Sequence, residues 1–411
     1  MAQLQHAVRR MAGRDPHEAG RASTPLELLF DLTFVIAFGA ASNQLAHALA
    51  EDHVREGVLA FLLATFAVTW AWINFTWFAS AYDTNDWPFR LTTMVQMVGV
   101  LLLALGLPDM FASVIHHDGH LDLRLMVAGY VVMRLPMVVQ WLRAGRQDPL
   151  RRTLCSTMVA TLVVGQAGWA LLLLANPAMG PTVVVVLLLI VIEVGGPLLA
   201  EKRHGGTPWH GHHIAERYGL MVIICLGEGL LGTNAALAAL VHDGWTVDIA
   251  VLGLAGTALT FGVWWTYFVV PSGHLLAAHR ERSFGWGYGH LPVFGAVVAI
   301  GAGLHAAAYY LEDETHLDAT GTVLAVAVPL AVYAVCFYAL YSTLTRSLDP
   351  FHVVLIVVTA VLLVLPVVMA AADVDMVWCL AVLALVPWVT VVGYETVGHR
   401  HNAEVLAALE S

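Results

Sequence analysis

The chain has 411 residues, of which 59% are hydrophobic and only 12% are charged. A soluble domain of average composition carries about twice that charged fraction, so the composition excludes an ordinary soluble globular protein. The formal net charge of −11 gives no reason to expect a nucleic-acid partner.

Residues 1–24 form a polar segment that is rich in arginine and histidine, and a long apolar region begins only after it. A secretory signal peptide would instead have a short charged segment and a brief apolar core. We interpret residues 1–24 as a cytoplasmic N-terminal segment.

From Pro25 onward, apolar runs of roughly 20 residues recur almost to the C-terminus, and each can cross about 30 Å of hydrocarbon. An open backbone cannot satisfy its hydrogen bonds in lipid, so these runs must be helices. The sequence therefore predicts an all-α fold, a polytopic membrane helical bundle of about 12 transmembrane helices whose partner is the lipid bilayer. The predicted spans are 25–49, 57–81, 89–115, 123–143, 153–175, 181–200, 214–240, 247–270, 288–310, 321–344, 350–371 and 375–398.

The basic residues are distributed unevenly between the two sides that these spans define. Sixteen of the 19 fall on the side of the N-terminus, Arg55 and Arg124 fall on the opposite side, and Arg134 lies within a span. Basic loops stay in the cytoplasm, so we expect both termini to be cytoplasmic. All but one of the basic residues are arginines, and this skew is typical of a GC-rich bacterial genome, which predicts a bacterial inner membrane.

The loops on the opposite side are acidic. Their carboxylates are either ordinary solvated loop ends or a field of one sign that draws cations to the outer mouth. They are Glu51, Asp52, Glu56, Asp118, Asp122, Asp243, Asp248, Glu312, Asp313, Glu314, Asp318, Asp373 and Asp375.

A weak internal repeat relates two sets of six spans. The first span aligns with the seventh so that Glu27 falls opposite Glu216, and the sixth aligns with the twelfth so that Glu193 falls opposite Glu395. An even number of helices per half predicts a parallel repeat about an axis along the membrane normal. The predicted parts are a first half at 25–200, a cytoplasmic linker at 201–213, a second half at 214–398 and a cytoplasmic tail at 399–411.

Two carboxylates lie near the start of the first span. Glu27 and Asp31 are four residues apart, so they share one helix face. Because two such charges repel each other, they need a shared arginine, a cation or a proton. The alternatives are a structural ion pair with an arginine of another helix and a proton or ion site.

Other charged residues lie deeper in the spans, where they usually face a bundle interior or a wet cavity. Glu228 lies in the small-residue run CLGEGLLG, so it is either a transport or proton site or half of a structural pair. Arg134 keeps its charge and needs a carboxylate or a bound anion, for which Glu193 is the candidate by residue type. Glu216 and Arg217, near the start of the seventh span, complete the candidate transport or ion-coupling residues.

The loop YDTNDWPFR contains a compact charged cluster. Asp86 can cap the helix that starts near Pro88, which leaves Asp83 and Arg90 to pair with each other. The preceding aromatic residues favour an interfacial belt and helix packing over an aromatic ligand cage. These residues are Trp70, Trp72, Trp77 and Phe78.

The motif WHGHHIAER suggests a metal site, since His212 and Glu216 are four residues apart on a helix. No HExxH motif and no repeated histidine boxes accompany it. We therefore interpret these histidines as loop residues, and we expect no metal ion, no cofactor and no catalytic residue. His290 and His305 are interpreted as hydrogen-bonded interior residues.

Five blocks of the sequence resemble those of the bacterial low temperature requirement protein A family. They are PLELLFDLTFVIAF, YDTNDWPFR, AERYGLMVIICLGEGLLG, WWTYF and YGHLPVFGAVVAIGAG, and they spread in the family's order over about two thirds of the chain. The final three spans match the family poorly. The resemblance implies a multi-pass membrane protein named for growth in the cold. It also implies that the family's charged positions fall on Glu27, Asp31, Asp83, Asp86, Arg90, Arg134, Glu193, Glu216, Arg217 and Glu228.

These residues favour a secondary transporter or ion-conducting protein, with proton or cation coupling through Glu27, Asp31 and Glu228. Its substrate would be an unidentified small solute or ion, and enzymatic activity is the less favoured class. The alternatives are a membrane-embedded enzyme acting on a lipid or lipid-linked substrate, and a non-catalytic sensor or scaffold. The oligomeric state is left open.

Overall fold

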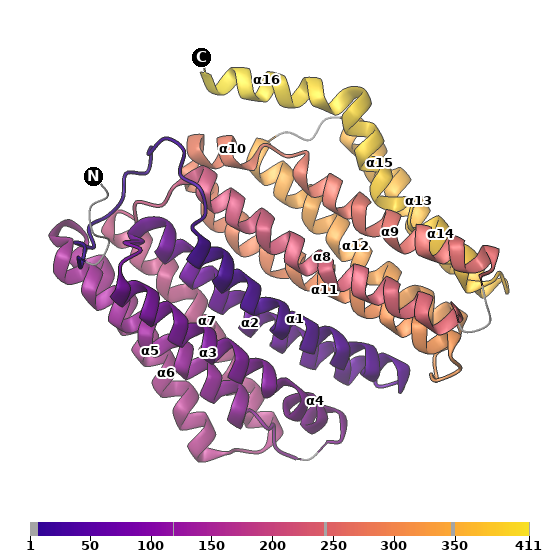
Figure 1. Ribbon diagram of the computed structural model, residues 1–411, viewed down its shortest axis with the longest axis horizontal. Coiled ribbons are helices and arrows are strands. Elements are labelled where there is room, and N and C mark those ends of the chain that lie inside the picture. The colour runs from indigo at the N-terminus through magenta and orange to yellow at the C-terminus, as the bar shows by residue number, and fades with distance from the viewer. Residues whose placement is uncertain (1–6, 118, 242–244, 347–349, 411) are drawn as a thin grey trace. The chain divides into compact units, whose positions relative to one another are not determined.

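The computed structural model describes residues 7–117, 119–241, 245–346 and 350–410, and the only regular secondary structure in these ranges is helix (Figure 1). Twelve helical spans in this part of the chain are long and apolar enough to cross a membrane. The predicted all-α, multi-pass fold is therefore confirmed. Asp118 and Asp243, two of the predicted acidic loop residues, lie outside the described residues.

The chain divides into two compact units, each of which contains helices from distant parts of the sequence. Unit 1 comprises Met1–Ala40 and Ala67–Arg217, and unit 2 comprises Ala41–Phe66 and Tyr218–Ser411. Three long helices contribute residues to both units, namely α1 (Pro25–Ala50), α2 (Val54–Tyr82) and α8 (Gly211–Val241). The predicted halves at 25–200 and 214–398, and the parallel repeat that relates them, remain predictions.

Unit 1 is built mainly from a series of neighbouring helices. Within it α3 packs against α5, α5 against α6, and α6 against α7, so helices that follow one another in the sequence lie side by side (Figure 1). Its further elements are α3 (Trp87–Leu105), α4 (Leu107–Ile115), α5 (Arg124–Gln147), a 3-10 turn (Pro149–Arg151), α6 (Arg152–Ala175) and α7 (Met179–His204).

Glycines let α3 and α5 approach each other closely. A Cβ atom built on Gly99 would lie 2.7 Å from the carbonyl oxygen of Gly129, and one built on Gly129 would lie 2.3 Å from the backbone nitrogen of Leu103. Small residues of this kind are typical of closely packed transmembrane helices. The crossing holds the side chains of Tyr130 and Arg134, on α5, inside unit 1.

Unit 2 contains the remaining helices. Within it α11 packs against α12, α12 and α14 against α13, and α9 against both α14 and α15. After a π turn (Tyr394–Gly398), α16 runs at an angle to α15 (Figure 1). The other elements are α9 (Val247–Phe268), α10 (Ser272–Ala278), a 3-10 turn (Arg280–Arg282), α11 (Ser283–Leu311), α12 (Ala319–Thr345), α13 (Pro350–Ala371), α14 (Met376–Leu383), α15 (Val386–Gly393) and α16 (His399–Glu410).

Candidate functional site

The first helix begins with a capping box that orients Glu27. The backbone N–H of Thr24 donates to Glu27 Oε2 at 2.8 Å, and the N–H of Glu27 donates to Thr24 Oγ1 at 3.3 Å. Pro25 follows the cap and fits the first turn, where its missing N–H is not needed. Because Oε2 is used by the cap, Oε1 is the oxygen of Glu27 that meets the charged groups around it.

Arg217 of α8 joins the two carboxylates of α1. Its Nη1 lies 3.0 Å from Glu27 Oε1, its Nε donates to Asp31 Oδ2 at 3.1 Å, and its Nη2 donates to Asp31 Oδ1. The indole N–H of Trp72 also donates to Asp31 Oδ1, at 2.6 Å. Arg217 and Glu27 are fully buried, and Asp31 is 1% exposed. Of the alternatives that the sequence left open, the sharing of one arginine is observed, with a planar guanidinium that binds both anions.

His213 lies one turn before Arg217 on α8 and faces the same carboxylate. Its Nε2 is 3.1 Å from Glu27 Oε1, and the side chain is fully buried. Neither ring nitrogen makes a hydrogen bond of good geometry with the described residues. His213 therefore places a ring nitrogen beside the same Glu27 oxygen that Arg217 contacts.

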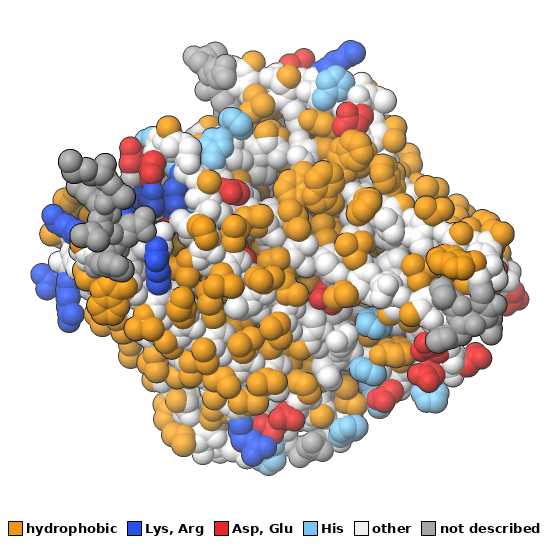
Figure 2. Space-filling view, in the orientation of Figure 1, with side chains coloured by type: hydrophobic (Ala, Val, Ile, Leu, Met, Phe, Trp, Pro, Cys, Tyr) orange, Lys and Arg blue, Asp and Glu red, His pale blue; other side chains and the backbone are white. Residues whose placement is uncertain are grey.

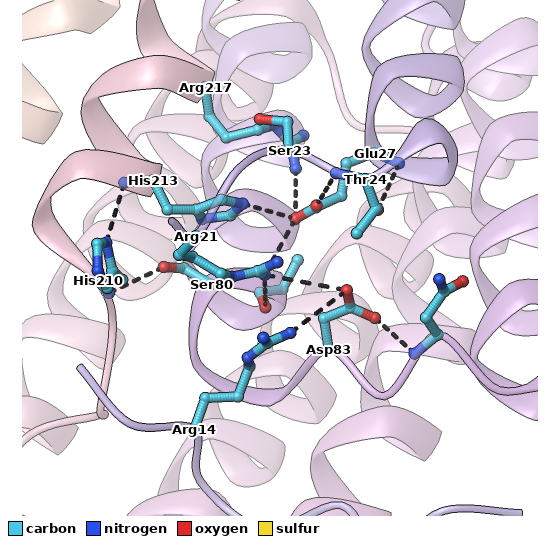
Figure 3. A network of polar contacts seen from close by, with 12 residues as sticks. Arg14, Arg21, Ser23, Thr24, Glu27, Ser80, Asp83, His210, His213 and Arg217 are labelled. Atoms are coloured by element: carbon cyan, nitrogen blue, oxygen red, sulfur yellow. Dashed lines mark hydrogen bonds and ion pairs between the residues drawn. The ribbon is translucent and has the colours of Figure 1, made fainter. Parts of the chain in front are cut away.

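The N-terminal segment supplies two more arginines to this cluster (Figure 3). Arg21 Nη2 lies 3.8 Å from Glu27 Oε1 and 3.9 Å from Asp83 Oδ2, and Arg14 Nη1 lies 3.9 Å from the same Asp83 oxygen. Burial raises the pKa of Asp83 to about 6; the Glu27 charge adds to this rise and the Arg21 charge opposes it. Burial also lowers the pKa of Arg21. Asp83 therefore changes its charge near pH 6.

Backbone hydrogen bonds hold the N-terminal segment in this position. The N–H of Arg14 donates to the carbonyl oxygen of Ala81 at 2.9 Å, and the Met11 side chain is fully buried. His210 Nδ1 accepts from the N–H of His213, so its Nε2 carries the proton and donates to the carbonyl oxygen of Glu18 at 3.0 Å. The segment is thus an integral part of unit 1.

Asp86 acts as a helix cap and as an ion-pair partner. Its carboxylate accepts from the N–H of Phe89 at 3.1 Å, which confirms the predicted cap of α3, and Arg143 binds both of its oxygens. Burial opposes ionisation, but the hydrogen bonds from Arg143 and the backbone outweigh burial and hold the pKa of Asp86 at about 2. Asp86 therefore keeps its negative charge at neutral pH.

The expected pairing of Asp83 with Arg90 is wrong. Arg90 is exposed and donates to Asn85 Oδ1 at 2.9 Å. Asp83 is instead buried and faces Arg14 and Arg21. The N-terminal segment, which lies far from this loop in the sequence, provides the partners that the loop itself does not.

A second buried cluster surrounds Glu193 of α7. Arg134 Nη2 lies 3.2 Å from Glu193 Oε2, which confirms the pairing expected from the residue types. Five side-chain donors saturate the carboxylate, a number that suits a fixed structural anion. The donors are Trp70 at 2.9 Å, Tyr130 at 2.6 Å and Arg134 on Oε2, with Gln166 at 3.2 Å and Trp169 at 3.3 Å on Oε1.

Two tryptophans of α2 therefore have a role other than the expected one. Trp70 and Trp72 are 1% and 0% exposed, and they donate their indole N–H groups to Glu193 and Asp31, respectively. The interpretation as an interfacial belt is wrong for these two residues, because both rings are buried inside the protein. The interpretation as packing residues is correct.

Glu228 lies in unit 2 and is 4% exposed. A Cβ atom built on Gly301 would lie 2.5 Å from the carbonyl carbon of Glu228, so α11 touches α8 at this residue. The Glu228 carboxyl faces the hydroxyl of Ser42. No arginine, lysine or histidine of the described chain forms an ion pair with it.

Glu216 differs from the other candidates because its side chain is exposed. Its carboxylate accepts the backbone N–H of Ser23 at 3.2 Å and thereby helps to hold the N-terminal segment. His212, which we interpreted as a loop residue although its spacing to Glu216 would suit a metal site, is exposed as well. Among the described residues there is no group of three or more His, Cys, Asp or Glu side chains that could hold a metal ion.

Sequence reasoning missed several residues of these clusters, although some carried a readable signal. The capping box Thr24-Pro25-Leu26-Glu27 is a known helix-start pattern, and His213 precedes Arg217 by four residues, hence on the same helix face. The partners of Asp83 and Glu228 carried no such signal. They depend on which distant segments meet in the fold.

Comparison with known proteins identifies the family. The family model described as "Bacterial low temperature requirement A protein (LtrA)" matches residues 22–387. The chain belongs to the LtrA family. An uncharacterised protein of Rhizobium meliloti (strain 1021) is 28% identical over 300 residues, which cover 69% of this chain and 68% of that protein.

The LtrA match includes Glu27, Asp31, Glu193, Arg217 and Glu228, but Arg14 and Arg21 lie before it. It extends to residue 387, so it also covers two of the final three spans, which we expected to match poorly. Glu395 lies beyond the match, and its side chain is exposed. Membership of the LtrA family and the twelve apolar spans together make the chain a multi-pass membrane protein of a bacterial family.

Proposed function

We propose that this LtrA protein is a secondary transporter or ion-conducting protein in which Glu228 binds a proton or a cation. One contrast among the buried carboxylates carries the proposal. Glu27, Asp31 and Glu193 each have an arginine nitrogen within 3.2 Å, whereas Glu228 has no ion-pair partner among the described residues. Among these four carboxylates of the spanning helices, Arg217 serves two and Arg134 serves one, and Glu228 has no such partner.

An ionised carboxylate without a partner is unfavourable in the hydrocarbon of a membrane, and this cost applies to Glu228. A carboxylate at the centre of a spanning helix costs about 3 kcal/mol by insertion scales, and more by other estimates. Glu228 must therefore be neutralised by a proton or by a bound cation. Exchange between these two states is the chemistry by which a transporter couples solute movement to a proton or cation gradient.

The cluster around Arg217 would be the second element of the mechanism. Glu27 Oε1 has Arg217 at 3.0 Å, His213 at 3.1 Å and Arg21 at 3.8 Å, whereas Asp31 is held by Arg217 and Trp72 in fixed geometry. Glu27 and Asp31, which share Arg217, would act together with Glu228 in proton or cation coupling. Arg134 and Glu193 would form a permanent internal pair.

The proposal includes an orientation in the membrane. We place the protein in the bacterial cytoplasmic membrane, with both termini in the cytoplasm. The uneven distribution of arginines supports this choice. The cluster around Arg217 would then lie at the cytoplasmic end of α1.

Proton movement in proteoliposomes tests the proposal. Vesicles containing the purified protein and a pH-sensitive dye are given an inward gradient of Na⁺ or K⁺, with the membrane potential clamped. We expect proton flux above that of empty vesicles with the parent protein and with the control Glu395→Gln, which changes an exposed glutamate. Glu228→Gln should abolish the flux and leave thermal stability unchanged.

Infrared spectroscopy tests the protonation state of Glu228 without a known substrate. A protonated carboxyl in the parent protein should give a C=O band at neutral pH that Glu228→Gln removes and Glu395→Gln leaves. Flux that is equal in parent and Glu228→Gln would contradict the proposal. So would a loss of stability in Glu228→Gln comparable to that expected for a broken ion pair.

A further inference from the structure

Unit 2 contains an apolar groove of about 450 Å³ that is open on one side. One wall comes from residues 45–65 of α1 and α2, and the other comes from residues 291–332 of α11 and α12. Small residues form its floor, including Gly295, Ala299 and Ala325, and exposed residues such as Leu62 and Val328 flank it. The groove is therefore a feature of the membrane-spanning part of unit 2.

The apolar lining of the groove determines what kind of molecule can bind there. Of the residues that line the groove, only Thr65 has a polar side chain, and its hydroxyl already donates to the carbonyl oxygen of Phe61 at 2.7 Å. A polar solute would lose its hydration there without gaining a partner, at a cost of a few kcal/mol for each polar group. A hydrocarbon chain has no polar groups and therefore does not bear this desolvation cost.

The length of the groove matches one leaflet of a bilayer. On α2 its lining runs from Val54 to Thr65, and at a rise of about 1.5 Å per residue this is about 16 Å. Half of the hydrocarbon core of a bilayer is about 15 Å thick. One acyl chain of the leaflet on the side of the α1–α2 loop would thus lie along the whole groove.

The open end of the groove has an acidic rim. Leu49 and Val54 line the groove on either side of the α1–α2 loop, and Leu317 lines it beside the α11–α12 loop. The two loops are tied together at Ala50, whose carbonyl oxygen accepts from the N–H of His316 at 2.7 Å. The rim residues Glu51, Asp52, Glu56, Glu312, Asp313, Glu314 and Asp318 outnumber the one basic residue of these loops, Arg55.

The same gathering of acidic and histidine side chains is visible at the lower right of the molecular surface (Figure 2), where α1 and α11 end (Figure 1). An anionic lipid headgroup would be repelled by this rim. A headgroup that carries an ammonium group would be attracted, by about 1 kcal/mol for each charge near the surface, which corresponds to about a fivefold preference.

We propose that the groove binds one acyl chain of an aminophospholipid, such as phosphatidylethanolamine, with the ammonium group of its head at the acidic rim. This site is independent of the proposed transport activity. The lipid fills the space between the α1–α2 hairpin and the α11–α12 hairpin of unit 2 and joins them from the bilayer side.

Lipid retention measured by native mass spectrometry tests the proposal. The protein is reconstituted into bilayers of equal parts phosphatidylethanolamine and phosphatidylglycerol, extracted in mild detergent and examined for bound lipid. We expect about a fivefold enrichment of phosphatidylethanolamine over phosphatidylglycerol. Ala299→Phe, which fills the groove from its floor, should lose the bound lipid.

Two further variants separate the groove from its rim. Val335→Phe enlarges a side chain of α12 that is 69% exposed and does not line the groove, so it should retain lipid as the parent does. A triple change of Glu312, Asp313 and Glu314 to the corresponding amides removes three of the seven rim carboxylates, so it should retain a lipid but weaken the headgroup preference. Equal retention of both lipids by the parent, or undiminished retention by a folded Ala299→Phe or by its milder alternative Gly295→Leu, would overturn the proposal.

Discussion

The guanidinium of Arg217 meets the carboxylate of Asp31 through two nitrogens, with Nε 3.1 Å from Oδ2 and Nη2 on Oδ1. Both side chains are buried, so water cannot take the place of either partner if the other is removed. Asp31→Asn removes the anion that Arg217 contacts through two nitrogens but leaves Glu27 to match its charge, so it should destabilise the protein by about 1.5 to 3 kcal/mol. Chemical unfolding of the purified protein in detergent measures this loss.

Arg217→Lys provides the matched comparison, because it keeps the charge and loses the two-nitrogen geometry. It should still destabilise, since a single ammonium group cannot contact Glu27 and Asp31 with the same alignment. If Arg217→Lys were as stable as the parent, charge alone would hold the two carboxylates. The two-nitrogen geometry of the Arg217 guanidinium would then make no contribution to stability.

Asp83 should make the stability depend on pH. Its pKa is about 6 in the folded protein against an ordinary value of 3.8, so the folded state binds the proton more tightly than the unfolded state. The resulting stabilisation is complete below pH 3.8 and is lost as the pH rises through 6. Relative to the parent, Asp83→Asn should therefore gain about 1 kcal/mol between pH 5 and pH 7.5.

Asp86→Asn is the control for this measurement. The pKa of Asp86 is about 2 in the folded protein, below its ordinary value of 3.8, so its contribution is constant above pH 5 and is lost only as the pH falls toward 2. The stability difference between Asp86→Asn and the parent should not change between pH 5 and pH 7.5. A difference that varies equally for both variants would assign the pH dependence to another group.

Replacing Glu193 alone should destabilise the protein more than replacing Glu193 and Arg134 together. Glu193→Leu leaves Arg134 buried without its anion and should cost about 3 to 5 kcal/mol. The double variant Glu193→Leu with Arg134→Met removes both charges and should cost less than either single change. Unfolding of the four proteins forms a double-mutant cycle, and additive losses would rule out a direct coupling between the two residues.

The proposed orientation predicts the outcome of reporter fusions. A reporter fused after Asp148 should be active as a cytoplasmic protein, and one fused after Asp313 should be active as an exported protein. The basis is the distribution of 16 basic residues on one side and two on the other. A cytoplasmic signal after Asp313 would reverse the orientation of α11.

The number and approximate positions of the helices could be predicted from the sequence. The predicted span 153–175 and the observed α6, Arg152–Ala175, agree because a lipid-facing run of apolar residues fixes the length of a helix locally. The break at Gly106, after which α4 starts with Pro108 in its first turn, was missed. A proline is compatible with a helix interior in many membrane spans, so its effect depends on the packing around it.

The clusters could be predicted only where the partners were limited by residue type. Arg134 is the sole basic residue deep in a span, so a buried carboxylate such as Glu193 was a natural partner. Asp83 had several possible partners, and the nearest in sequence, Arg90, was the wrong one. A segment without regular structure, such as the one that carries Arg14 and Arg21, has no periodic pattern from which its position could be predicted.

The ion pair between α1 and α8 has a consequence for the order in which the protein is made. Glu27 and Asp31 belong to the first helix that the ribosome delivers to the membrane, but Arg217 is synthesised 186 residues after Asp31. During that interval α1 must enter the bilayer before the counter-ion of Asp31 has been made, while Glu27 has only Arg21, which precedes it in the chain. The final position of α1 is therefore fixed late, when the seventh span arrives, and a chain that is cut before Arg217 should hold its first helix only loosely.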